Sequence, residues 1–161
     1  MQSQTRWYTF ALSIGLLLSS FNTSAFAGNP HCSDVGGAIL TNVGGFGQVD
    51  GTPTTMGTAT GDLRGALGVQ IVSNSPDFTI VGVQHHWVTE NGETLSIDPA
   101  QAHGTFVAPG LLAITKYQVH LSGGTGRYSG TTGDLSFIGE IDFNNGHAVL
   151  RYSGHICSTG N

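Results

Sequence analysis

The sequence predicts an all-β fold, a single antiparallel β-barrel of about eight strands. Short runs alternate between apolar and polar residues, which is the period of a half-buried strand. Asn-Gly pairs, which suit tight hairpin turns, lie between some of these runs. Glycine is abundant, at 25 of 161 residues, and only 9% of the residues are charged. Such a composition favours a compact sheet with frequent turns.

Residues 1–27 are predicted to be a cleaved signal peptide. Arg6 gives a positive start, residues 10–18 form a short apolar run, and Ala25-Phe26-Ala27 matches a small-x-small cleavage site. The run is shorter than the roughly 20 residues of a spanning helix. We therefore expect one exported domain over 28–161, secreted or periplasmic, with no membrane span after signal cleavage.

Nine alternating runs account for the expected barrel. They lie near 35–41, 45–50, 62–73, 77–90, 93–98, 101–108, 112–121, 132–143 and 147–157. The last two are the clearest, because Asn144-Asn145-Gly146 separates them as a hairpin turn would. The stretch 36–61 is rich in Gly and Thr, and it predicts either a weak strand pair or a long loop. A closed barrel is favoured over a sandwich because closure removes exposed sheet edges and glycines within the runs permit bends.

Cys32 and Cys157 are the only cysteines, and they lie near the two ends of the expected domain. Export favours their oxidation to a disulfide. A bridge across so long a loop is worth about 4.7 kcal/mol by chain entropy. Two free thiols serving as metal ligands or redox groups are the alternative, which no Cys-x-x-Cys pair supports.

The most distinctive local sequence is Ser122-Gly123-Gly124-Thr125-Gly126-Arg127-Tyr128-Ser129-Gly130. It resembles the glycine-rich turn of dirigent proteins, and it is similar to that of allene oxide cyclase-like barrels. The resemblance implies an eight-stranded antiparallel barrel with an apolar cavity. It implies no activity, because the site residues of either family find no counterparts here. A wider likeness to secreted bacterial proteins adds no activity either.

The turn also has a physical interpretation of its own. Gly123, Gly124 and Gly126 allow the backbone to reach positive φ angles. We expect Arg127 to bond backbone carbonyls or to pair with Asp134, and Tyr128 to cap the end of the barrel.

Residues 84–90 form the best candidate site. His85 and His86 point to opposite faces of a strand, so they cannot both bind one metal ion. We expect neither a metal nor a cofactor, and we take either histidine as a ligand contact or an acid–base group, with Glu90 nearby. Trp87 is expected in the core or lining a cavity. Tyr117 is expected in the core or lumen, on the face of Ala113, Thr115, Val119 and Leu121.

The charge balance excludes one class of partner. Ten acidic residues against five Lys and Arg give a net charge of −5. Nucleic-acid binders need clustered cations, so no nucleic-acid partner is expected.

Three functions stay open. The favoured one is non-catalytic binding of a small apolar or aromatic ligand in the barrel lumen. The second is a structural or interaction module of the cell envelope or the extracellular space. The third is a cyclase or isomerase that uses His85 or His86 in the cavity. The sequence sets neither the identity of the ligand nor the oligomeric state.

Overall fold

The computed structural model describes residues 30–43, 48–49 and 51–158. The predicted signal peptide lies outside them, as does most of the expected strand 45–50. The described elements follow the chain in the order β1 (His31–Asn42), β2 (Gln48–Val49), β3 (Thr52–Ala59), η1 (Gly61–Leu63), β4 (Gly65–Asn74), β5 (Ile80–Thr89), β6 (Thr94–Ile97), β7 (Ala100–Ala108), β8 (Leu111–Gly124), η2 (Gly126–Tyr128), β9 (Thr132–Asp142) and β10 (His147–Ser158), where η marks a short 3-10 turn.

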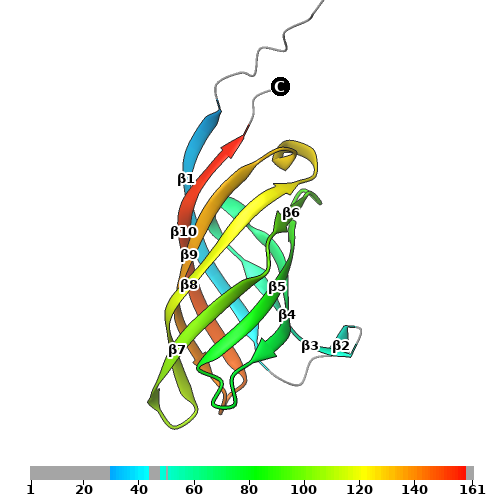
Figure 1. Ribbon diagram of the computed structural model, residues 1–161. Coiled ribbons are helices and arrows are strands. Elements are labelled where there is room, and N and C mark those ends of the chain that lie inside the picture. The colour runs from blue at the N-terminus through cyan, green and yellow to red at the C-terminus, as the bar shows by residue number, and fades with distance from the viewer. Residues whose placement is uncertain (1–29, 44–47, 50, 159–161) are drawn as a thin grey trace, which may run out of the picture.

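Eight strand positions close into an antiparallel barrel (Figure 1). The order runs β1, β10, β9, β8, then β6 and β7 together, β5, β4 and β3, and β3 pairs with β1 to complete the ring. β6 and β7 share one position because both lie between β5 and β8, on either side of Asp98-Pro99. β2 pairs with β3 in a hairpin that projects from the wall. The predicted all-β barrel is confirmed.

Several predicted boundaries move for local reasons. The 62–73 run begins as the turn η1, and β4 starts at Gly65. The 77–90 run becomes a strand at Ile80, because the Asp77 carboxylate accepts hydrogen bonds from Ser75 and Thr79 and holds a turn before it. β3 lies in the stretch for which we predicted a strand pair or a loop, and it is a strand.

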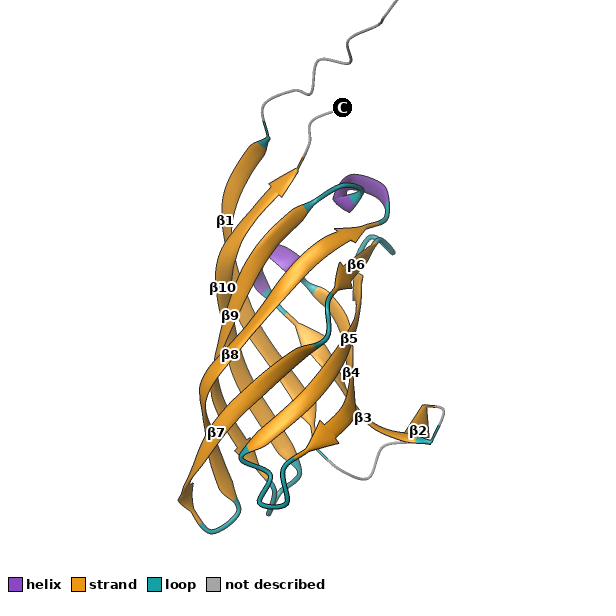
Figure 2. Ribbon diagram, in the orientation of Figure 1, coloured by secondary structure: helices purple, strands orange, loops and turns teal. Residues whose placement is uncertain are grey.

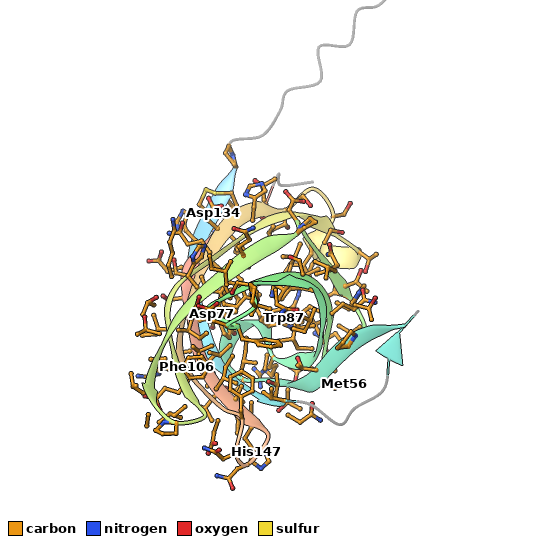
Figure 3. All side chains as sticks on the ribbon, turned by 60° about the horizontal axis from the view of Figure 1, so that its bottom comes forward. Met56, Asp77, Trp87, Phe106, Asp134 and His147 are labelled. Carbon is orange, nitrogen blue, oxygen red and sulfur yellow. A yellow bond between two sulfur atoms is a disulfide. The ribbon has the colours of Figure 1, made fainter. Side chains whose placement is uncertain are left out.

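The half of the barrel nearer the start of β1 and the end of β10 is filled by large side chains. Trp87, Phe137 and Tyr152 are buried there, and the Trp87 and Tyr152 rings meet edge to face with centroids 5.6 Å apart. Figure 3 shows Trp87 inside the ring of strands and Met56 outside it. Both 3-10 turns lie toward this end (Figure 2). Trp87 donates to the Leu63 carbonyl at 2.8 Å, and Tyr152 accepts from the Leu63 amide at 2.9 Å, so η1 is tied to the core.

The glycine-rich turn covers this filled end. Gly126 has a φ of 58°, in the left-handed region that favours glycine, and Tyr128 is buried beneath the turn. The prediction for Arg127 needs correction. Its guanidinium pairs with Glu93 at 2.9 Å, whereas Asp134 bonds His120 at 3.0 Å. η2 brings Arg127 back over the start of β6, and this leaves Asp134 to its cross-strand neighbour.

The predicted disulfide is confirmed. Cys32 and Cys157 lie directly opposite each other on β1 and β10, and they are bonded. The bridge therefore joins the beginning of β1 to the end of β10. None of the described helical segments has the length and apolar character needed to cross a membrane.

Replacing both cysteines with serine is expected to lower the free energy of unfolding by about 3 to 5 kcal/mol, because the open chain gains conformational entropy when it unfolds. Urea unfolding of the oxidised protein and of the Cys32→Ser/Cys157→Ser variant measures the difference, and the wild type unfolded with a dithiol reductant serves as the matched reference. A loss below about 1 kcal/mol would contradict the stabilising role of the bridge.

Candidate ligand-binding cavity

A cavity of about 930 Å³ occupies the half of the barrel away from the disulfide. Its wall consists mainly of aliphatic side chains from the inner faces of the strands, including Val69, Val83, Leu112, Ile114, Ile141 and Leu150. Among the described residues that line it, none has a charged side chain. The volume and the lining are typical of a site for a small organic molecule.

The hollow follows from the sizes of the inward residues. Toward the filled end the inward positions hold Trp87, Phe137 and Tyr152, whereas around the cavity they include Ala102 and Ala148. A barrel of eight strands has an interior that large side chains just fill. The smaller inward residues in the cavity half therefore leave part of the interior unfilled.

Tyr117 lies at the inner end of the cavity because β8 contains a β-bulge. The register of β8 with β9 shifts between Ile114 and Gln118. The inward positions consequently change from Leu112 and Ile114 to Tyr117 and Val119. Ala113 and Thr115 thus do not share the face of Tyr117, and that part of the prediction was wrong. A bulge re-aims the side chains that follow it, and here it turns Tyr117 into the lumen.

His85 bonds Tyr117 at the inner end of the cavity, although His85 is not among the described residues that line the cavity. Its side chain points inward from β5 and is 4% exposed, and its Nε2 atom is hydrogen-bonded to the Tyr117 hydroxyl. The two rings stack with centroids 5.7 Å apart, and the Phe137 ring lies 4.8 Å from that of Tyr117. Among the described residues, the Nδ1 atom of His85 has no hydrogen-bond partner. Of His85, Tyr117 and Phe137, only Tyr117 is among the described residues that line the cavity, and the other two rings pack against it.

Burial sets the protonation of this pair. Desolvation, with a smaller contribution from the neighbouring charge of His86, lowers the pKa of His85 to about 4. Burial raises the pKa of the Tyr117 hydroxyl above its usual value. At neutral pH both groups are uncharged, so the Tyr117–His85 pair adds no net charge at the inner end of the cavity.

Three phenylalanines surround the open end. Phe78, Phe106 and Phe143 all line the cavity and are 47%, 43% and 40% exposed. The Phe143 centroid lies 6.5 Å from that of Phe78 and 6.2 Å from that of Phe106. We call these three residues the phenylalanine rim. It presents an apolar mouth to solvent at the end of the barrel opposite the disulfide.

The backbone at Phe78 is unusual. Its φ of 57° is the only positive value among the described non-glycine residues, and a bulky side chain rarely adopts it. Asp77 holds this conformation through the turn that it organises with Ser75 and Thr79. The turn thus fixes the Phe78 ring over the mouth at some cost in backbone energy.

The structure separates the other candidate residues from the cavity. His86 points outward and bonds Gln70 at 2.7 Å, and Glu90 is exposed and pairs with Arg64 at 3.0 Å. Glu90 therefore cannot assist His85, which corrects the expected grouping. Trp87 belongs to the core and does not line the cavity. The phenylalanine rim was missed as a group. Phe143 follows the alternation of 133–143, but its meeting with Phe78 and Phe106 joins segments far apart in the sequence, which alternation does not reveal.

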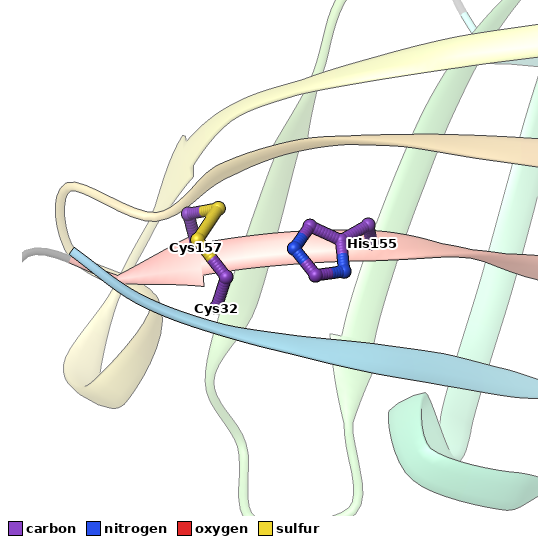
Figure 4. Close-up of side chains that lie close together, drawn as sticks. All are labelled: Cys32, His155 and Cys157. Carbon is purple, nitrogen blue, oxygen red and sulfur yellow. A yellow bond between two sulfur atoms is a disulfide. The ribbon is translucent and has the colours of Figure 1, made fainter.

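Within the described part of the chain, one group of potential metal ligands is close enough to share an ion: Cys32, His155 and Cys157 (Figure 4). Both sulfur atoms are consumed by the disulfide, and His155 bonds Asp34 at 2.9 Å. The group is therefore no metal site in the oxidised protein.

Comparisons with known proteins show no family for this chain. No protein family matches the sequence, and no curated protein matches it either. Among solved structures, the chain is similar to a pterocarpan synthase dirigent protein, with 12% sequence identity and a TM-score of 0.38 over 82% of this chain and 88% of that chain.

Acidification is expected to destabilise the fold through His85. The unfolded chain binds a proton at this residue below pH 6.5, whereas the folded protein does so only near pH 4. Stability is therefore lost as the pH falls through this window, by about 2 to 3 kcal/mol between pH 7.5 and 4.5. Urea unfolding at both pH values measures the loss. In the His85→Gln variant this position cannot bind a proton. An equal loss of stability in that variant would refute the attribution of the pH dependence to His85.

Proposed function

We propose that this protein binds a small, uncharged apolar or aromatic molecule in the lumen of its barrel. The observation that supports this function is the cavity of about 930 Å³, whose described lining has no charged side chain and whose mouth is apolar. An apolar molecule of suitable size would gain about 25 cal/mol for each Å² of apolar surface that it buries there.

The charge of the lining restricts the ligand. A buried ion without a partner is strongly disfavoured, and the polar residues around the cavity are neutral threonines, Asn74 and Tyr117. A charged ligand would therefore have to leave its ionic group at the mouth. Neutral molecules, by contrast, fit the whole depth of the cavity.

Binding is favoured over catalysis by the groups at the inner end of the cavity. Acid–base catalysis requires a group whose pKa lies near the working pH and a second polar group that converges on the substrate. His85 titrates near pH 4, and Glu90 lies on the outer surface. We infer that the barrel holds its ligand without transforming it.

Export is part of the same proposal. The disulfide between Cys32 and Cys157 is compatible with an oxidising compartment, and the predicted signal peptide would direct the domain there. An exported binding barrel can shield a poorly soluble molecule from water outside the cytoplasm.

The neutral fluorophore N-phenyl-1-naphthylamine tests the function. We expect its emission to rise on addition of the protein, because the cavity excludes water from the dye. Ala102→Phe, which fills the lumen, should weaken binding at least tenfold. Gln101→Phe places the same ring on the outer surface of β7 and serves as the matched control. Equal binding by the two variants would place the dye elsewhere, and no binding by the wild type would overturn the function.

The strained turn at the mouth gives a kinetic prediction. Phe78→Asn removes the ring over the opening and supplies a residue that tolerates positive φ. The substitution relieves backbone strain but also removes the ring contact with Phe143. Because these two effects offset each other, the free energy of unfolding should change by less than about 1 kcal/mol. Stopped-flow release of the dye should become several times faster. Unchanged release would show that Phe78 does not limit passage through the mouth.

A further inference from the structure

We propose that the inner end of the cavity recognises an uncharged carbonyl group, and that the Tyr117 hydroxyl donates the hydrogen bond that holds it. The inference rests on the proposed function, since it names the polar group by which a lumen ligand would be oriented. The preferred ligand is then an apolar or aromatic ketone or aldehyde that enters with its carbonyl oxygen foremost.

The hydrogen bonds of His85 assign the direction of this contact. A neutral imidazole has one N–H group and one unprotonated nitrogen. If the proton were on Nδ1, a buried N–H would face no acceptor among the described residues, and buried N–H groups without a partner are rare. With the proton on Nε2, His85 donates to the Tyr117 oxygen. This second arrangement leaves an unused lone pair on Nδ1 and moves the unpaired donor to the Tyr117 hydroxyl. Tyr117 lines the cavity, where water or a ligand can accept from it, whereas the buried Nδ1 atom has no such access.

Because Tyr117 is one of the residues that line the cavity, its O–H group is then free to donate toward the lumen. Because its oxygen already accepts from His85, the remaining proton must point to another acceptor. Val83, Ala102 and Ile114 line the same inner part of the lumen, and their side chains offer none. A ligand oxygen at this position would satisfy a donor that the wall leaves without an acceptor.

The hydrogen-bond acceptor of the ligand has to be uncharged, and it has to lie at one end of the molecule. An anionic oxygen would meet no cation in the described lining, and the desolvation that keeps His85 uncharged would also oppose a carboxylate. The other polar side chains of the described lining stand near the mouth: Asn74 at the end of β4, Thr79 just before β5, Thr41 near the end of β1, and Thr54 and Thr55 near the start of β3. The distribution therefore fits an apolar body with a single acceptor at its inner end.

Fluorene and 9-fluorenone test this inference, because the two rigid tricyclic molecules differ by one carbonyl oxygen. Their affinities are measured by displacement of N-phenyl-1-naphthylamine from the wild type and from Tyr117→Phe. We expect the wild type to bind fluorenone about three- to tenfold more tightly than fluorene, which is the net effect of one neutral hydrogen bond. Tyr117→Phe should lose this preference and keep its affinity for fluorene, which also reports that the variant is folded.

Infrared spectroscopy supplies a second readout that a merely structural role of Tyr117 would not change. A hydrogen bond lowers the stretching frequency of the fluorenone carbonyl, so the bound ketone should absorb at a lower wavenumber in the wild type than in Tyr117→Phe.

The outcomes separate the two proposals. If both compounds bind but their affinity ratio is the same in the two proteins, the carbonyl inference is overturned and lumen binding stands. The same conclusion follows if the carbonyl frequency does not differ between them. If neither compound nor the dye binds to the wild type, the proposed function fails, and the carbonyl inference fails with it.

Discussion

The short pairing of β3 with β1 is the constraint on which the barrel depends. Three residue pairs, from Ile39↔Ala59 to Thr41↔Gly57, close the ring. The approach is possible because glycines stand at the contact. A Cβ atom on Gly57 would lie 2.0 Å from the Leu40 carbonyl oxygen, and one on Gly37 would lie 2.0 Å from that of Thr60. Without this closure the cavity would lack one wall, and two sheet edges would be exposed to solvent.

The parts of the fold that depend on local alternation could be predicted from the sequence. The β9–β10 hairpin forms where Asn144-Asn145-Gly146 indicated it, with Asp142 opposite His147, and the two cysteines meet because the terminal strands are neighbours. The inward and outward positions of His85 and His86 also follow from the period of a strand. These features need no knowledge of which distant strands pair.

The inner end of the cavity could be predicted only in part. His85 and Tyr117 were both among the candidates, but their contact depends on a bulge in β8 that reverses the inner face between Ile114 and Tyr117. Nothing in the sequence around Thr115 and Lys116 marks that bulge. A regular strand would bury apolar residues whether its odd-numbered or its even-numbered positions pointed inward. The cavity itself depends on the combined volume of the inward side chains that lie at one level of the barrel. To know which side chains share a level, one needs the register of every strand.

If the barrel binds a ligand as proposed, the two ends of the cavity would select different properties of that ligand. The phenylalanine rim would contact a molecule that passes the mouth, so it would discriminate by size and hydrophobicity and act on the rates of binding and release. The Tyr117–His85 pair lies beyond the aliphatic wall, so it would act only on a molecule that has already entered. A core built for stability alone would place apolar side chains at both positions, since a buried nitrogen without a partner disfavours folding. The polar pair is best explained by the orientation that it would impose on a bound molecule, and that explanation requires the Tyr117 proton to face the lumen.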